Sequence, residues 1–96
     1  MTIPKQFKDD LEKAIKILKD AGCTEIYLFG SLIEEKKNNS KSDIDIAVKG
    51  LPKSDFFSIY GELLTTLHHS VDLVGLDYEM PFSQLLNKRG KLERVA

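Results

Sequence analysis

The sequence contains little cysteine, no excess of either charge and no long apolar run. Cys23 is the only cysteine among 96 residues, so no disulfide can form within the chain, which fits a reducing compartment. Lys and Arg number 14 against 15 Asp and Glu, giving a net charge of −1. We therefore expect no global field that attracts nucleic acid or an acidic membrane surface.

The same absences bound the location and the domain count. No apolar run approaches the roughly 20 residues that a membrane-spanning helix needs. The N-terminus is charged from Lys5 onward and lacks the apolar segment of a signal peptide. These features predict a cytoplasmic protein without membrane contact. With 42% hydrophobic residues the chain can build a core, and its length predicts a single domain over residues 1–96.

The hydrophobic periodicity predicts alternating helices and strands. Apolar residues recur at helical spacing over residues 4–21, with Gly22 as a stop signal, and again over 54–68, where Ser54 is the expected N-cap. The apolar face of this second helix is expected to contain Phe56, Ile59, Leu63, Leu64 and Leu67. Strands are expected at 24–29, 43–49 and 70–76, a final helix at 81–88, and either a short edge strand or a frayed tail at 92–95. We predict an α+β fold in which a small mixed β-sheet packs with helices.

Two aspartates in the second expected strand carry the first chemical signal. Asp43 and Asp45 are two residues apart, so their side chains point to the same face of the strand, opposite Ile44, Ile46 and Val48. Carboxylates held this close repel each other unless a cation lies between them. Mg²⁺ prefers oxygen ligands and usually keeps substrate phosphates in its coordination shell. This pair is therefore a candidate metal site.

Two further features extend this candidate site. Gly30 and Ser31 follow the first strand, where a glycine permits close approach of a ligand and free backbone N–H groups suit phosphate. Asp72 lies between Val71 and Leu73 in an apolar strand, which predicts a buried carboxylate that needs a partner. A metal shared with the other two aspartates would supply that partner.

The combination Gly30-Ser31, Asp43-x-Asp45 and Asp72 resembles the motif of the minimal nucleotidyltransferases of the DNA polymerase β superfamily. These proteins often serve as antitoxins of HEPN toxins. The resemblance implies the polymerase β-like nucleotidyltransferase fold and Mg²⁺-dependent transfer of AMP from ATP to a protein hydroxyl. It also implies a HEPN toxin as partner, in a hetero-oligomer.

The resemblance assigns a role to each matching residue. Asp43 and Asp45 would hold the metal ions that bridge the triphosphate, and Asp72 would help bind the catalytic metal and activate the attacking hydroxyl. Gly30 and Ser31 would bind the β and γ phosphates.

The chain departs from the family motif in two places. Eleven residues separate Ser31 from Asp43, where about ten are common, and Leu32, Ile33 and Glu34 replace the arginine that often follows Gly-Ser. Lys36, Lys37 or Lys41 would then supply the positive charge near the phosphates. Two alternatives remain open: an antitoxin that acts by occlusion without catalysis, and a nucleotidyltransferase subunit for a small-molecule or RNA acceptor.

Overall fold

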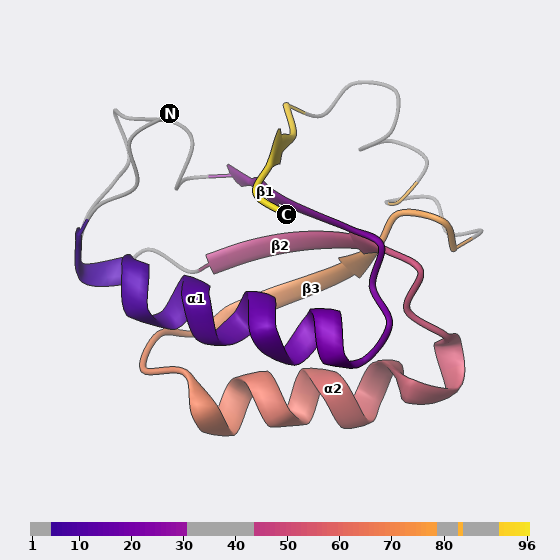
Figure 1. Ribbon diagram of the computed structural model, residues 1–96, viewed down its shortest axis with the longest axis horizontal. Helices are drawn as coiled ribbons and strands as arrows, with labels where there is room; N and C mark the ends of the chain where they lie inside the picture. The colour runs from indigo at the N-terminus through magenta and orange to yellow at the C-terminus, as the bar shows by residue number, and fades with distance from the viewer. Residues whose placement is uncertain (1–4, 31–43, 79–82, 84–90) are drawn as a thin grey trace.

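The computed structural model describes residues 5–30, 44–78, 83 and 91–96. In chain order the elements are α1 (Lys5–Asp20), β1 (Glu25–Phe29), β2 (Ile44–Lys49), α2 (Lys53–Thr66), β3 (Val71–Gly75) and β4 (Glu93–Arg94). The two helices lie side by side over one face of the sheet (Figure 1). The predicted α+β fold, with helices packed on a small sheet, is confirmed. None of the described helices combines the length and apolar character needed to cross a membrane.

The sheet is mixed, with strand order β3-β2-β1-β4. β1 pairs antiparallel with β2 and with β4, whereas β2 and β3 run parallel and are joined through α2. β4 coincides with the edge-strand alternative expected at 92–95. The end of β1 and the starts of β2 and β3 therefore meet at one end of the sheet, as Figure 1 shows.

The core lies between the helices and the near face of the sheet. Ile44, Ile46 and Val48 of β2 are completely buried there, as their alternation in the sequence predicts. α1 contributes Phe7, Leu11, Ala14 and Leu18. Each large apolar side chain buried in this way stabilises the fold by about 1.5–3 kcal/mol. Most of the stability of α1 thus comes from the sheet beneath it.

Two details of α2 differ from the prediction. The helix begins at Lys53 with Pro52 as its N-cap, and no side chain caps it, so Ser54 is not the N-cap. The extended backbone of Pro52 already provides the non-helical conformation that an N-cap needs. Leu64 is 52% exposed because only the side of α2 that contains Leu63 faces the core. Residues 31–43 and most of the helix expected at 81–88 lie outside the described residues.

Cys23 is buried at the start of β1. Burial, helped by the negative charge of Asp77, raises the pKa of its thiol. A thiol with a raised pKa is a poor nucleophile at neutral pH. Cys23 therefore acts as a small apolar core residue, as the sequence indicates.

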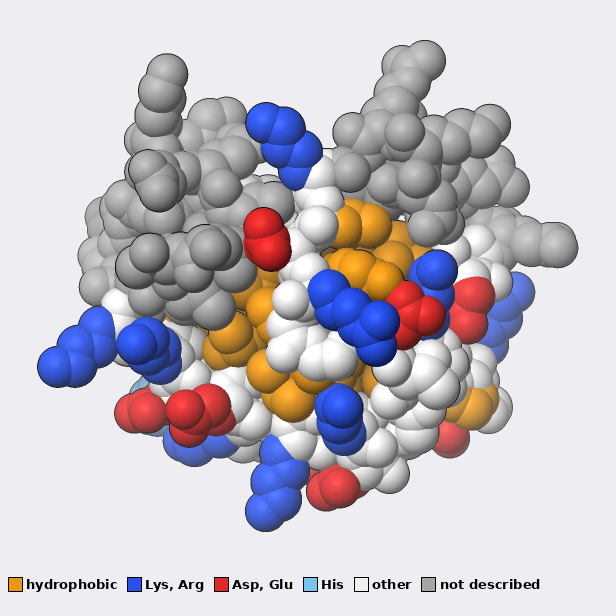
Figure 2. All heavy atoms as spheres, turned by 45° about the horizontal axis from the view of Figure 1, so that its top comes forward, with side chains coloured by type: hydrophobic (Ala, Val, Ile, Leu, Met, Phe, Trp, Pro, Cys, Tyr) orange, Lys and Arg blue, Asp and Glu red, His pale blue; other side chains and the backbone are white. Residues whose placement is uncertain are grey.

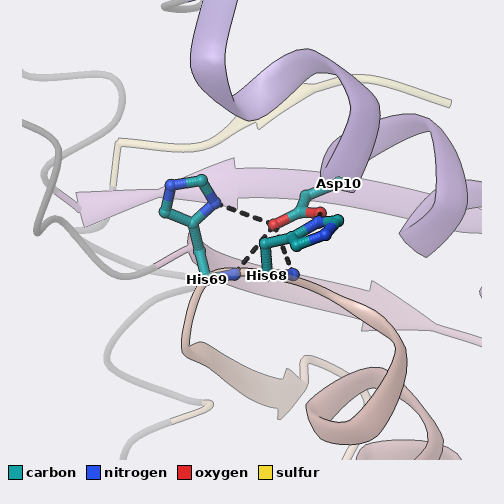
Figure 3. Close-up of polar contacts among 3 residues, drawn as sticks. All are labelled: Asp10, His68 and His69. Atoms are coloured by element: carbon teal, nitrogen blue, oxygen red, sulfur yellow. Dashed lines mark hydrogen bonds and ion pairs between the residues drawn. The ribbon is translucent and has the colours of Figure 1, made fainter.

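Asp10 of α1 forms the main polar contact within the core (Figure 3). Its side chain is 2% exposed and lies against the turn that joins α2 to β3. The backbone N–H groups of His68 and His69 donate to Oδ2 at 2.9 and 2.8 Å. The Nδ1 atoms of the two imidazoles lie 3.2 Å from Oδ1 and 2.8 Å from Oδ2 respectively. One carboxylate thus fixes the backbone immediately before β3 to α1.

The two histidines do not converge on a common ligand. His68 is largely exposed, whereas the ring of His69 packs against Phe7 with centroids 4.3 Å apart. Both rings contact Asp10, which gives the two adjacent histidines a structural role just after α2.

Asp10 makes stability depend on pH. Burial alone raises the pKa of its carboxyl, but the hydrogen bonds from His68 and His69 outweigh burial and lower the pKa from 3.8 to about 2. A lowered pKa in the folded state stabilises the protein above the pKa of the unfolded chain. That contribution, about 2 kcal/mol, is lost as the pH falls from about 4 through about 2.

We predict that Asp10→Asn lowers the free energy of unfolding by about 2–3 kcal/mol at pH 7. The side-chain amide has only one oxygen that can accept hydrogen bonds, and its NH₂ group cannot accept from the His68 and His69 groups. The difference from the wild type should shrink as the pH falls from about 4 to about 2. Urea denaturation across this pH range measures it. Asp9→Asn is the matched control, since Asp9 is the exposed neighbour on the same helix. Equal losses in the two variants would contradict the role of Asp10.

Candidate functional site

Two of the three predicted aspartates lie directly beside each other in the sheet. Asp45 of β2 and Asp72 of β3 are partners in the parallel register. Neighbouring strands are about 4.8 Å apart, and paired residues point to the same face. Both carboxylates therefore leave the sheet on the face opposite the helices, since Ile44 and Ile46 face the core.

Gly30 lies against this pair at the end of β1. Phe29, the last residue of β1, pairs with Asp45 across the β1–β2 ladder, so Gly30 follows directly beside that carboxylate. The φ of Gly30 is +75°, and a Cβ built there would overlap the Asp45 side chain. Only glycine permits both the backbone conformation and the close approach. The predicted proximity of Gly30 and Asp45 is therefore present in the fold.

A shallow pocket of about 360 Å³ contains the two carboxylates. Tyr60 of α2 also lines it, and its hydroxyl lies 3.3 Å from Oδ1 of Asp72. Phe29, Leu73 and Val74 also line it. Among the described residues, the pocket presents acidic oxygens beside aromatic and aliphatic surface.

The expected burial of Asp72 is wrong. Val71 and Leu73 are 2% and 5% exposed, whereas Asp72 itself is exposed. The alternation of a strand sends the two apolar neighbours into the core and the aspartate to the opposite face. Asp72 therefore does not need a cation to compensate for burial, and its relevance comes from its position opposite Asp45. Asp43 and Ser31 lie outside the described residues.

The carboxylates fit a hard cation. Paired aspartates supply oxygen donors, which Mg²⁺ prefers, and like charges directly opposite each other are unfavourable without a counter-ion. Among the described residues there is no group of three or more His, Cys, Asp or Glu that could hold a metal. A site built on Asp45 and Asp72 would thus depend on further oxygens, from Asp43 or from the phosphates of a substrate.

Tyr60 is the residue that sequence reasoning missed. It lies one helical turn after Phe56 but is not among the residues of the expected apolar face. Nothing in the pattern shows that its hydroxyl would reach β3. Only the packing of α2 against the edge of the sheet brings the two together.

A second depression lies beside α2, and Leu73 and Val74 are the described residues that it shares with the carboxylate pocket. Its volume is about 330 Å³, and the aromatic rings of Phe56, Phe57 and Tyr78 form much of its wall. Lys53 is its only charged lining residue among those described. Because the described residues that line it include no carboxylate, this depression is not a candidate metal site on their evidence.

Charges of both signs are interspersed on the molecular surface. Figure 2 shows Lys and Arg side chains next to Asp and Glu side chains around a hydrophobic area, with no broad region of one sign among the described residues. This distribution agrees with the net charge of −1. The described residues on this face form no extended basic surface of the kind that binds a polynucleotide.

The mixed sheet, the helices on one face and the strand-borne aspartates beside a glycine turn define a nucleotidyltransferase-type domain. The family model for the polymerase beta nucleotidyltransferase domain matches residues 12–92. The chain belongs to this family, as its motif suggests. A search of curated proteins gave no match.

Several solved structures are similar to this chain. A toxin–antitoxin complex with AMP-PNP contains a chain of 33% identity and a TM-score of 0.61, with 84% of this chain and 69% of that chain covered. The MntA–HepT toxin–antitoxin complex gives 31% identity and a TM-score of 0.59, covering 88% and 69%. A tri-AMPylated HEPN toxin in complex with its MNT antitoxin, from Shewanella oneidensis, gives 32% and 0.59, with the same coverage.

We predict that Gly30→Ala lowers both stability and cation affinity, because the added Cβ must displace the Asp45 carboxylate. The unfolding free energy should fall by more than about 1 kcal/mol. Mn²⁺ titration followed by electron paramagnetic resonance should show a weakened site.

The control for this variant is Gly50→Ala. Gly50 has a φ of +90°, and its Cβ would meet the Thr24 backbone nitrogen at 3.0 Å, away from the aspartates. This variant should lose stability but keep its Mn²⁺ affinity. Equal Mn²⁺ affinity in both variants would contradict a role of Gly30 at the site.

Proposed function

We propose that this protein is a Mg²⁺-dependent nucleotidyltransferase that transfers AMP from ATP to a hydroxyl group of a protein. We further propose that it is an antitoxin and that the acceptor is its cognate HEPN toxin. The observation that carries the proposal is the pairing of Asp45 with Asp72 beside Gly30, in a chain of the polymerase beta nucleotidyltransferase family.

The chain's own residues would divide the work as follows. Asp43, Asp45 and Asp72 would hold Mg²⁺, which when bound neutralises the triphosphate and stabilises both the attacking and the leaving oxygen. The backbone after Gly30 and the Ser31 hydroxyl would bind the β and γ phosphates. Asp72 would accept the proton of the attacking hydroxyl. That hydroxyl oxygen bonds to the α-phosphorus, and pyrophosphate leaves.

Two similar structures support the choice of donor, acceptor and partner. One similar structure contains the ATP analogue AMP-PNP, and another contains a tri-AMPylated HEPN toxin with its MNT antitoxin. Both chains are more than 30% identical to this one over most of its length. We infer a hetero-oligomer in which a toxin side chain enters the carboxylate pocket. In the minimal nucleotidyltransferases that this chain resembles, the modified side chain is commonly a tyrosine. We propose a cytoplasmic location, because the cytoplasm supplies ATP and a reducing environment.

The test is AMP transfer to the partner encoded beside this chain. Wild-type protein, ATP labelled at the α-phosphate and Mg²⁺ should label the partner. Asp45→Asn should reduce labelling by at least about a hundredfold, because a ligand of the cation is lost. The fold should persist, since the like-charge repulsion with Asp72 is relieved. Circular dichroism and quantified label measure the two effects.

The control is Asp20→Asn, which changes an exposed aspartate at the far end of α1 and should leave labelling unchanged. Absence of label on the partner with wild-type protein would contradict the enzymatic proposal. If Asp45→Asn still neutralises the toxin fully in cells, the protein acts by occlusion instead.

A further inference from the structure

The hydroxyl of Tyr60 links α2 to the outer edge of the described sheet at Asp72. Tyr60 is half-buried, and its ring packs edge-on against Phe56 with centroids 5.8 Å apart. The hydroxyl donates to the Val71 carbonyl at 2.9 Å and lies 3.3 Å from Oδ1 of Asp72. A ring held by the core thus places its polar end beside one of the two strand-borne carboxylates.

The Val71 contact anchors this hydroxyl on the outer edge of β3. Ile44 N–H donates to the Ser70 carbonyl, so the next carbonyl, that of Val71, points away from β2. β3 is the last strand on its side of the described sheet. Tyr60 therefore satisfies a carbonyl that β2 cannot reach, and this bond fixes the position of the phenol oxygen.

Asp72 lacks the packing that would otherwise fix its side chain. It is exposed on an edge strand, where a carboxylate can adopt several rotamers. The Tyr60 hydroxyl can share its proton between the Val71 carbonyl and Oδ1. This contact restricts the carboxylate, while the second oxygen, Oδ2, can still bind a cation.

We propose that Tyr60 is a positioning residue that holds the Asp72 carboxylate in the orientation needed to bind a divalent cation together with Asp45. The positioning role of Tyr60 rests on the proposed function in one respect: both assign the carboxylates of Asp45 and Asp72 to a divalent cation. Residues that hydrogen-bond to metal ligands typically change metal affinity by 10–100-fold when they are removed. Tyr60→Phe keeps the ring and its contact with Phe56 and removes only the hydroxyl.

The test is Mn²⁺ binding by the full chain, measured by electron paramagnetic resonance. Tyr60→Phe should raise the Mn²⁺ dissociation constant about tenfold. The matched control is Tyr78→Phe, because the Tyr78 hydroxyl also donates to a backbone carbonyl, that of Leu51 at 2.6 Å, but contacts neither aspartate. Tyr78→Phe should leave Mn²⁺ affinity unchanged.

A second comparison separates positioning from a general loss of structure. In the Asp72→Asn background, Tyr60→Phe should cause no further loss of Mn²⁺ affinity, since the group that it positions is already changed. Unchanged affinity in Tyr60→Phe, equal losses in Tyr60→Phe and Tyr78→Phe, or no Mn²⁺ binding by the wild type would each overturn the proposal. So would AMP found on Tyr60 itself after incubation with ATP, because the hydroxyl would then be an acceptor.

The outcome is independent of AMP transfer to the partner. If the wild type binds Mn²⁺ in a Tyr60-dependent way but labels no partner, the positioning role stands and the proposed function fails. If the wild type and Tyr60→Phe label the partner equally and bind Mn²⁺ with equal affinity, the proposed function stands and the positioning role fails.

Discussion

The buried carboxylate of Asp10 is the polar interaction on which the arrangement of the site depends. It binds two consecutive backbone N–H groups and two imidazoles in the turn before β3, so α1, the end of α2 and the start of β3 are held together. A nearly fully buried carboxylate is tolerated because its oxygens accept several hydrogen bonds. Asp72 lies only three residues after His69. The contact of Asp10 with the His68 and His69 backbone therefore helps to fix the position of Asp72 opposite Asp45.

The register of the sheet places the two carboxylates next to each other. The parallel pairing of β2 with β3 places Asp45 opposite Asp72, while the antiparallel pairing of β1 with β2 brings Phe29 and Gly30 to the same end. One face of these strands is buried under the helices, so a slip of one residue would move the aspartates into the core. The hydrophobic packing thus maintains the register on which the acidic site depends.

Family membership and site geometry support different parts of the functional account. The family model and the similar toxin–antitoxin structures establish a nucleotidyltransferase-type domain. The pairing of Asp45 with Asp72 supports a cation site. The proposal covers the acceptor, the metal and the partner of this chain. The roles of Asp43 and Ser31 and the single domain are predictions from the sequence. Tyr60 adds a feature that neither composition nor motif contains, because it depends on how α2 meets the edge of β3.

The sequence by itself determined the order of helices and strands, the faces of β2 and the motif of Gly30, Asp45 and Asp72. These features follow from local periodicity and residue type, which act over a few residues. Tertiary structure alone decided the exposure of Asp72, the exposed position of Leu64 and the contacts of Asp10 and Tyr60. Each of these joins segments far apart in the chain or depends on which face another element covers, and a local pattern contains no information about that partner.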